Sequence, residues 1–405
     1  MAESANAAAA LPLQGVRVLD VSQVMAGPFC SMLLGDMGAD VIKIEPPDGG
    51  DQTRRAMGFK LKGNDSLGFF NLNRNKRSLA LNLKSKTARD VFYRLTETAD
   101  ILLENYRPGV TQRLGIDYPT LAKINPRLIY ASISGFGQTG PWSQRPGFDL
   151  IAQAMAGVMS ITGQPDGPPT KAGVPVSDIG CALFALYGIL SAFIGREKTG
   201  RGQYVDASLF EAAIAFSIWD ISEYWGTGRI PTPLGTANRF SAPYQAVRAS
   251  DAFFVMGANN NKLWQTLCEV LERPDLLADA RFGKIADRLL NRVALIEELE
   301  KSFAARTAAN WIEILLAAGI PAGPILNYAQ ALASDHAKAR EAVMEFEHPV
   351  EGTVKSIGFP VKLSETKQRV RLPPPLLGQH NDEILRELGV DDKTREQLRA
   401  EGAAP

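Results

Sequence analysis

The stretch Gly173–Phe193, GVPVSDIGCALFALYGILSAF, puts one carboxylate, that of Asp178, at the head of a long apolar segment. A Ser-Asp pair followed directly by an apolar run is typical of a helix start. The residues from Ile179 onward have almost no polar face, so we expect this helix to be buried. The rest of the chain therefore has to build a core around it.

Two interpretations of Asp178 are open at this point. As an N-cap, its carboxylate would accept the free backbone N–H groups of the first helical turn. As a nucleophile, it would be held ionised by the helix dipole in a site closed to water. Spacing alone favours the cap, because caps are common and carboxylate nucleophiles are rare.

Length and composition exclude several classes of protein. A chain of 405 residues is too long for one ordinary core, so two domains are expected. Lys+Arg and Asp+Glu both number 44, which leaves no basic field for nucleic acid. No apolar run has the length and purity of a membrane span, so no membrane partner is expected.

The cysteines and the N-terminus indicate a cytoplasmic protein. Cys30, Cys181 and Cys268 are odd in number and widely spaced, which argues against a disulfide framework and for a reducing compartment. The first residues are rich in alanine and lack the basic region of a secretory signal. We therefore expect residues 1–14 to be a short disordered tail.

The N-terminal part predicts a parallel sheet. VRVLDV (16–21) is a strand, FCSMLLGDM a short helix and DVIKIE (40–45) a second apolar strand, which together form a βαβ unit. The turn SQVMAGP is not GxGxxG, so the dinucleotide fingerprint is absent where it would lie. We expect a Rossmann-like α/β sheet that does not bind NAD through this loop.

The remaining elements follow the same alternation as far as residue 225. The polar loop 46–75 should lie at the carboxyl edge of the sheet, where ligands bind in α/β folds. Near Gly226 the composition changes to a Gly/Pro/Thr linker, and a smaller α/β domain follows. Further strands are expected at 78–83, 100–106, 128–133 and 204–209, and helices at 84–99, 110–114, 118–124, 149–161, 210–224 and 381–388, the last followed by a charged tail.

Histidine and metal chemistry are both disfavoured. The histidines, His336, His348 and His380, all lie in the last fifth of the chain, and no HExxH spacing occurs. A covalent carboxylate is one of the few routes left. It is an adequate nucleophile toward a thioester, and the mixed anhydride that forms can pass its acyl group on, which is CoA transfer. Such a site must exclude water and offer backbone N–H donors, which SGFGQTGP or GANNN could supply.

Many ordered segments carry a resemblance to a known family. They include VMAGP, GADVIKIEPPDGGDQTR, NRNKRSLALNLK, ENYRPG, PGFDLIAQAMAGVMSITG, VSDIGCALFALYGI, KTGRGQYVDASL and GIPAGPI. Through them the chain resembles the family III CoA-transferases, from LQGVRVLDVSQVMAGP (13–28) to PPPLLGQHNDEILRELG (373–389).

The resemblance implies a set of site residues. The family's nucleophile is the Asp of the GVPVSDIG-like segment, which is Asp178 here. Its CoA contacts fall on sheet-edge loops that offer two cations for phosphates and an apolar or aromatic wall for adenine. Leu81 could instead be a core residue, and Lys84 a solvated helix start. The contacts are Val24, Met25, Ala26, Leu81, Lys84, Asn105, Tyr106 and Arg113.

Within the family the chain resembles the succinyl-CoA:dicarboxylate branch, including glutarate CoA-transferase. LGTANRFSAPYQAV (234–247), VMGANNNKLW and PPPLLGQH carry this likeness. Arg239, with Ser241 beside it, is the candidate partner of a second carboxylate, because an arginine binds a carboxylate in a bidentate manner. A purely structural role for Arg239 stays open.

Some positions depart from the family pattern. Some members carry an Arg where this chain has Pro46, and the Gly-tetrad loop of formyl-CoA transferase is missing, which puts formyl/oxalate specificity in doubt. The racemase branch needs a His in a GHD-like motif, but this chain has Phe148 in PGFD, and a phenyl ring cannot exchange protons.

The resemblance also implies the architecture and the reaction. Two identical chains would interlock as linked rings. Each chain would have a disordered tail (1–14), a large Rossmann-like CoA-binding domain (15–225), a linker and small α/β domain (226–330), and a C-terminal segment returning to the large domain (331–405). CoA would pass from succinyl-CoA to a small dicarboxylate through an aspartyl anhydride and an aspartyl-CoA thioester.

The CoA thioester would be a substrate, with no tightly bound cofactor and no metal. Three rival functions are kept: a formyl/oxalate or carnitine-type CoA-transferase, a 2-methylacyl-CoA racemase, and a non-catalytic CoA-ester binder.

Overall fold

The computed structural model describes residues 10–56 and 58–404. Most of the expected tail lies outside these ranges. Leu13, which we placed in that tail, is buried, and its backbone N–H donates to the Met37 carbonyl at 2.9 Å. The chain forms two compact units. The first runs from the start of the described chain to Val158 and adds Ala172–Ser217 and everything from Asp335 onward; the second contains Met159–Lys171 and Ile218–Ser334.

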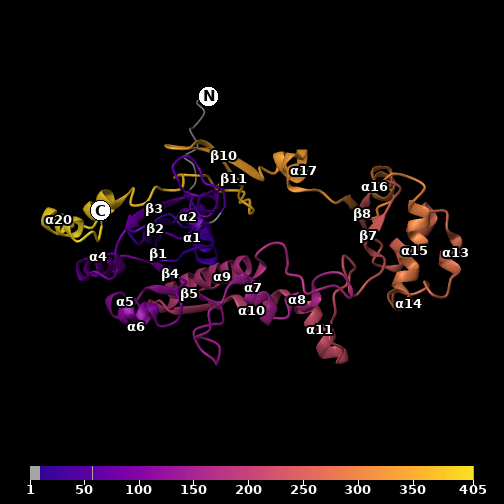
Figure 1. The fold of residues 1–405 in the computed structure, drawn as a ribbon, viewed down its shortest axis with the longest axis horizontal. Coiled ribbons are helices and arrows are strands. Elements are labelled where there is room, and N and C mark those ends of the chain that lie inside the picture. Colours follow the sequence, from indigo (N-terminus) through magenta and orange to yellow (C-terminus); the bar gives the residue numbers. More distant parts are fainter. Residues whose placement is uncertain (1–9, 57, 405) are drawn as a thin grey trace. The chain divides into compact units, whose positions relative to one another are not determined.

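The first unit is built on a six-stranded sheet, and all of its pairings are parallel. The strand order β3-β2-β1-β4-β5-β6 is that of a Rossmann-like fold (Figure 1). The expected α/β fold class is therefore confirmed. The strands are β1 (Arg17–Asp20), β2 (Asp40–Glu45), β3 (Lys76–Ala80), β4 (Ile101–Glu104), β5 (Ile129–Ser134) and β6 (Tyr204–Ser208).

Helices cover both faces of this sheet, because successive strand residues point to opposite sides. Val18 belongs to the core under α1 (Ala26–Asp36) and α9 (Val176–Thr199), and Leu19 to the core under α4 (Lys86–Glu97). The second core also takes in α6 (Tyr118–Ile124), α19 (Asn381–Glu387) and α20 (Asp392–Ala400), so the C-terminal segment packs on the first unit.

The long helix α9 is buried on one side only. Gly180, Cys181, Ala185 and Ile189 are buried, and α9 contacts α1, β5 and β6, whereas the other side exposes large side chains such as Tyr187, at 71%. The expectation of a fully buried helix was therefore wrong, because small residues face the sheet and large ones face away.

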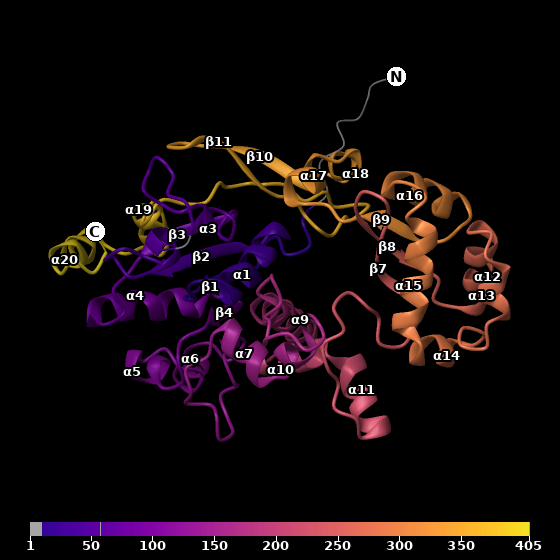
Figure 2. The same cartoon turned by 45° about the vertical axis from the view of Figure 1, so that its right-hand side comes forward.

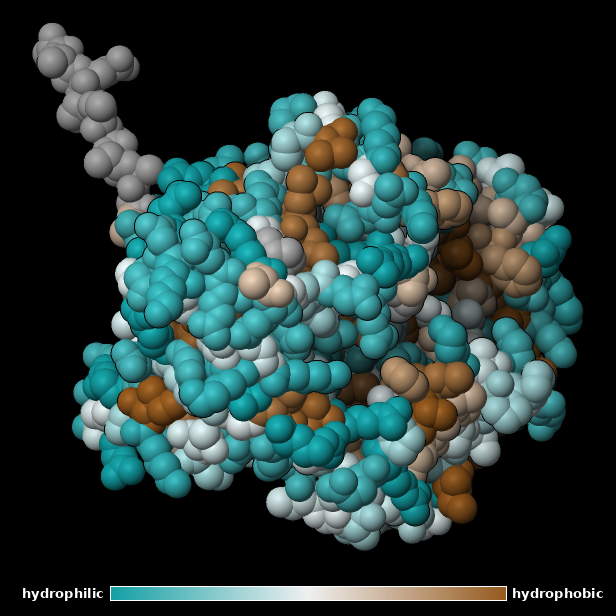
Figure 3. Space-filling view, turned by 60° about the vertical axis from the view of Figure 1, so that its left-hand side comes forward, coloured by the Kyte–Doolittle hydropathy of each residue, from teal (hydrophilic) through white to brown (hydrophobic). Residues whose placement is uncertain are grey.

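By length and apolar composition α9 could cross a membrane. Its buried side, however, packs against a sheet, which is the position of a core helix in an α/β domain. On the face drawn in Figure 3 hydrophobic residues gather in separate patches among hydrophilic ones, without forming a continuous belt.

Several helix boundaries differ from those expected. The helix expected at 149–161 is divided into α7 (Asp149–Met155) and α8 (Val158–Ile161), with Gly157 at φ +90° between them. The helix expected at 210–224 is likewise divided. The remaining helices of this unit are α2 (Thr53–Ala56), α3 (Leu67–Phe70), α5 (Val110–Leu114), α10 (Leu209–Phe216) and α18 (Asp335–Ala339), and its hairpin is β10 (Val343–His348) with β11 (Gly352–Ile357).

The second unit has an antiparallel sheet, β7-β8-β9, with its own buried core around Trp264, Phe254 and Phe303 (Figure 2). Its strands are β7 (Tyr244–Arg248), β8 (Phe253–Gly257) and β9 (Ala322–Pro324). Its helices are α11 (Ile218–Thr227), α12 (Asn261–Val270), α13 (Pro274–Ala278), α14 (Ile285–Leu290), α15 (Arg292–Phe303), α16 (Ala308–Ala317) and α17 (Tyr328–Ala333).

Candidate active site

A cavity of about 310 Å³ opens at the carboxyl ends of β1 and β4. This is the point at which the strand order of the sheet reverses, and ligands of open α/β sheets bind in the crevice there. Its lining comes from the loops after β1, β2 and β4, from the end of β5 and the loop after it, from the segment before α7, and from the starts of α1, α9 and α10. The lining residues are Gln23, Val24, Met25, Ala26, Gln52, Asn105, Tyr106, Arg107, Ile133, Ser134, Gly135, Gly147, Phe148, Asp178 and Leu209.

Asp178 lies in the first turn of α9 but does not cap it. The N-cap position is Pro175, whose side chain has no acceptor. The backbone N–H groups of Ser177 and Asp178 donate to Oδ1 of Asp149, at 2.9 and 3.4 Å. Among the described residues no hydrogen bond or ion pair involves the carboxylate of Asp178, so this carboxylate is available to the cavity.

The surroundings of Asp178 favour its neutral form. Burial raises the pKa of its carboxyl, and the nearby charge of Asp149 raises it further, to about 7. The dipole of α9 acts in the opposite direction, since a helix N-terminus favours an anion. Asp178 should therefore change its protonation state near neutral pH, a property that is common for groups at active sites.

The turn after β1 is held in an uncommon backbone conformation. Val24 has a φ of +71°, which a β-branched residue rarely adopts. Its N–H donates to Oδ1 of Asp51 at 3.1 Å. Asn105 exchanges two hydrogen bonds with the backbone of Gln23, at 2.8 and 2.7 Å, and so ties the end of β4 to this turn. Strain of this kind persists only where neighbouring groups fix the backbone.

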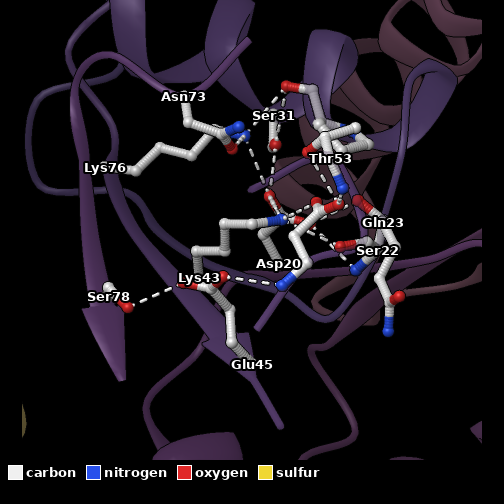
Figure 4. Close-up of polar contacts among 12 residues, drawn as sticks. Asp20, Ser22, Gln23, Ser31, Lys43, Glu45, Thr53, Asn73, Lys76 and Ser78 are labelled. Atoms are coloured by element: carbon white, nitrogen blue, oxygen red, sulfur yellow. Dashed lines mark hydrogen bonds and ion pairs between the residues drawn. The ribbon is translucent and has the colours of Figure 1, made fainter. Parts of the chain in front are cut away.

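Beneath this turn lies a buried group of charges (Figure 4). Lys43 donates to the Ser22 carbonyl at 2.9 Å and forms an ion pair with Asp51, also at 2.9 Å. Lys76 reaches Asp20 at 3.0 Å, and all these side chains are fully or almost fully buried. Because every buried charge has a partner of opposite sign, the turn rests on a rigid support.

The pKa values of this group follow from its pairing. Burial alone would raise the pKa of Asp20, but Lys76 and Lys43 outweigh burial and hold that pKa well below its usual range. Burial lowers the pKa of Lys76 to about 8, although Asp20 opposes this shift. At neutral pH both partners therefore carry their charges.

A second buried acid, Glu104, supports the wall of the cavity. Its carboxylate accepts the Tyr106 N–H at 2.8 Å and the Ser132 hydroxyl, and the Tyr204 hydroxyl donates to Ser132 at 2.8 Å. Burial raises the pKa of Glu104 to about 7, and Asp206 adds to the shift. This set of contacts joins the ends of β4, β5 and β6.

Two glycines allow the loops of the site to meet. A Cβ on Gly135 would lie 2.8 Å from the Cα of Gly147, so neither position accepts a side chain without a shift of the backbone. This contact fixes the segment that presents Phe148 and Asp149. Phe148, at the position where a racemase would need histidine, lines the cavity and is 68% exposed.

The structure brings many of the expected site residues to one cavity. Asp178 lines it together with Val24, Met25, Ala26, Asn105 and Tyr106. Three expected CoA contacts do not line it. Leu81 is 1% exposed within the core, whereas Lys84 and Arg113 lie on the surface.

Arg239 and Ser241 belong to the second unit. Arg239 pairs with Asp220 at 2.7 Å and with Glu223 at 3.1 Å, and Ser241 bonds Asn238 through both its N–H and its hydroxyl. Both residues therefore have local structural partners.

The remaining sequence candidates have structural places outside the cavity. His348 contacts the Pro374 carbonyl, His380 accepts the Ser78 N–H, and no histidine lines the cavity. Asn260 of GANNN caps α12 by accepting the Leu263 N–H. Within residues 10–56 and 58–404 no group of acids, histidines and cysteines could hold a metal ion.

Sequence reasoning missed some of the lining and its supports. Arg107 lines the cavity and is exposed, and its signal was its place in ENYRPG. Gln52 comes from the loop we had placed at the sheet edge. The contact between Asp149 and the start of α9 had no signal, because it joins residues 28 and 29 positions apart.

Comparisons with known proteins agree on one family. The family model described as CoA-transferase family III matches residues 13–381. An acetyl-CoA:oxalate CoA-transferase of Acetobacter aceti is 42% identical over 90% of this chain and 92% of its own. The succinyl-CoA:glutarate CoA-transferase of Homo sapiens is 38% identical over 96% of this chain and 89% of its own.

Solved structures show the same fold. A CAIB/BAIF family protein from Brucella suis superposes with a TM-score of 0.82 at 34% identity, covering 94% of this chain and 100% of its own. Rv3272 from Mycobacterium tuberculosis gives a TM-score of 0.83 at 31% identity, covering 93% of this chain and 99% of its own. With an aspartate-bearing cavity at the switch point of a Rossmann-like sheet, and a family match across nearly its whole length, this chain belongs to the family III CoA-transferases.

Proposed function

We propose that this enzyme moves CoA from an acyl-CoA donor, succinyl-CoA, to a small dicarboxylate, with Asp178 as the covalent nucleophile. The observation that carries the proposal is the availability of the Asp178 carboxylate. It lines the cavity at the switch point, and another residue caps its helix. A carboxylate nucleophile needs this freedom, because every hydrogen bond it accepts lowers its reactivity.

The reaction balances through two anhydrides. Asp178 attacks the donor thioester and releases CoA thiolate, which then attacks the Asp178 carbonyl of the anhydride and frees the donor acid. The acceptor carboxylate attacks the resulting aspartyl-CoA thioester and releases the thiolate again. The thiolate takes the acyl group of the acceptor and regenerates the Asp178 carboxylate. No proton, metal or redox partner is consumed.

The walls of the cavity suit the charges that develop during this sequence. The helix α1 begins at Ala26 within the lining and has no side-chain cap, so its first N–H groups can stabilise an anionic oxygen. Arg107, exposed at the same cavity, is a cation for a phosphate of CoA.

The substrate class rests on relatives that are named for dicarboxylates: oxalate, glutarate and mesaconate. Arg239 remains the candidate for the second carboxylate, although a ligand would have to compete there with Asp220 and Glu223. Arg239→Ala should raise KM for dicarboxylates and spare monocarboxylates. Equal effects on both classes would reject the clamp.

We also propose that two copies of the chain interlock as a dimer in the cytoplasm. Within each unit large apolar side chains are exposed, Tyr187 on α9 in the first and Trp225 on α11 in the second, and a second chain would cover them. Light scattering coupled to gel filtration tests the dimer; a monomeric mass for the active enzyme would reject it.

The decisive experiment uses oxygen-18 in the acceptor. In one turnover of succinyl-CoA with labelled glutarate, one labelled oxygen should remain on Asp178, where peptide mass spectrometry can find it. Asp178→Asn should lose transfer and retain CoA binding by calorimetry. Unchanged turnover in that variant would sink the nucleophile claim, and a wild type that binds CoA esters without transfer would leave the binding protein as the correct alternative.

The acceptor is then identified from a panel. The pure protein is incubated with succinyl-CoA and a series of mono- and dicarboxylates, and the CoA esters are read by mass spectrometry. Exclusive use of formate or of a carnitine-type acid would replace the dicarboxylate proposal. Inversion of a 2-methylacyl-CoA would support the racemase, which lacks its histidine at Phe148.

A further inference from the structure

The start of α9 is capped from a different helix. Most helices whose first turn carries an acid could use that acid on their own N–H groups. Here Oδ1 of Asp149, at the start of α7, accepts the N–H of Ser177 at 2.9 Å and that of Asp178 at 3.4 Å. Pro175 at the N-cap cannot provide an acceptor from its side chain.

Asp149 is itself held from its other side. Its Oδ2 accepts Nε2 of Gln153 at 2.7 Å, one turn further along α7. Oε1 of Gln153 accepts the Ala172 N–H at 2.9 Å, and Gln153 is fully buried. The amide is therefore locked in one orientation, and this orientation fixes which oxygen of Asp149 faces α9.

We propose that Asp149 is a positioning residue that takes over the capping of α9 and so leaves the Asp178 carboxylate free to attack the thioester. This role rests on the proposed use of Asp178 as nucleophile. Without Asp149 the N–H groups of Ser177 and Asp178 would lose their acceptor, and the Asp178 carboxylate in the same first turn would be drawn to take its place. The nucleophile would then turn from the cavity to its own helix.

The charge of Asp149 has a second effect. A like charge disfavours the ionised form of its neighbour, and after burial Asp149 is the cause that raises the pKa of Asp178 to about 7. A carboxylate that is more basic is also more nucleophilic toward a thioester carbonyl. The titratable groups near this end of α9 also include Cys30, Cys181, Asp206 and Glu211, and Tyr106 and Arg107 line the same cavity as Asp178.

A pair of variants separates the hydrogen bonds from the charge. Asp149→Ala removes both. Asp149→Asn combined with Gln153→Glu exchanges the amide and the carboxylate: Asn at 149 can accept from Ser177 and donate to Glu at 153, which still accepts from Ala172. Each of these contacts keeps a donor and an acceptor, while the carboxylate moves from residue 149 to residue 153, one turn further along α7. Asp90→Asn, on the exposed side of α4, is the control.

The expected results differ for each variant. Asp149→Ala should lower kcat on the order of 100-fold with CoA affinity retained, because the reacting oxygen is misplaced. The exchanged pair should recover most of kcat, and the acid limb of its kcat/KM profile should move to lower pH. The control should match the wild type in both readouts.

A direct titration keeps this proposal separate from the proposed function. The carboxyl carbon of Asp178 is assigned by NMR as the resonance lost in Asp178→Asn, and its pKa should fall in both variants. An unmoved pKa together with wild-type kcat in Asp149→Ala would overturn the positioning role even if Asp178 is the nucleophile. If Asp149→Ala does not fold, an exchanged pair with an unshifted acid limb and pKa overturns it instead.

Discussion

Replacing Asp178 by asparagine should stabilise the fold relative to the wild type, and by more as the pH rises, although it should also abolish transfer. The pKa of Asp178 in the fold is about 7, against an ordinary value of 3.8, because burial and Asp149 disfavour its charge. A carboxyl whose folded pKa is raised binds more protons in the folded state than in the unfolded state. Its stabilising effect is therefore lost as the pH rises from the unfolded toward the folded pKa.

The magnitude follows from the shift. Three pKa units correspond to about 4 kcal/mol, which is the free energy that the fold gives up to keep Asp178 ionised above neutral pH. Much of this cost is already present in mild acid, where the unfolded carboxyl is ionised and the folded one protonated. Between about pH 5.5 and about pH 8.5 the advantage of the asparagine variant should therefore grow by about 2 kcal/mol.

Denaturant unfolding of the wild type and the variant at both pH values, followed by circular dichroism, measures this difference. Asp90→Asn is the matched control, because Asp90 is exposed and, among residues 10–56 and 58–404, pairs only with Lys86 one turn away. Its effect should be the same at both pH values. If the advantage of Asp178→Asn does not change with pH, or if the variant is less stable at both, then the carboxylate is not in a desolvated site and the reasoning fails.

Three further perturbations test the support of the site. Lys43→Met should lower the free energy of unfolding by about 3–5 kcal/mol, because it leaves the buried carboxylate of Asp51 without its cation. Lys86→Met on the surface should change that free energy by about 0.5 kcal/mol or less, and equal small effects of both variants in denaturant unfolding would contradict this. Gly27→Ala should weaken CoA-ester binding in calorimetry, since its Cβ would overlap the side chain of Ser22 and displace the turn after β1; unchanged affinity would show that the turn is not part of the site. Glu104→Gln should raise the thermal midpoint more above neutral pH than below it, because burial raises the pKa of Glu104 to about 7, and an equal shift at both pH values would refute this.

The sheet of the first unit could be predicted because its strands are buried on both faces and therefore appear as short apolar runs. The run at 40–45 matches β2 residue for residue. By contrast, α20 (Asp392–Ala400) was predicted to be a charged tail. Among its residues only Leu398 is buried, so the sequence shows no apolar helix face that would have indicated a packed helix. A strand at Tyr244–Arg248 was missed because it follows a linker without periodicity.

For the site, local sequence could identify the residue type but not the contacts. The Ser-Asp pair before an apolar run marked the start of α9, and the family resemblance marked Asp178 as its nucleophile. No local sequence pattern showed that the Asn105 amide is hydrogen-bonded to the backbone of Gln23, or that Leu81 is enclosed in the core. Such contacts depend on which parallel strands lie side by side, and this is a property of the whole sheet.

Asp178 does not have to serve both as the cap of α9 and as a nucleophile, because a second carboxylate, that of Asp149, is also available to the helix start. The fold provides two, and it assigns one function to each: Asp149 accepts the N–H groups, and Asp178 faces the cavity. The arrangement costs stability, because the second acid is desolvated beside the first. The same two causes, burial and a like charge, make the carboxylate basic. The basicity of Asp178 and the instability it brings therefore have one physical origin, and a variant that lowers the pKa of Asp178 should also stabilise the fold at neutral pH.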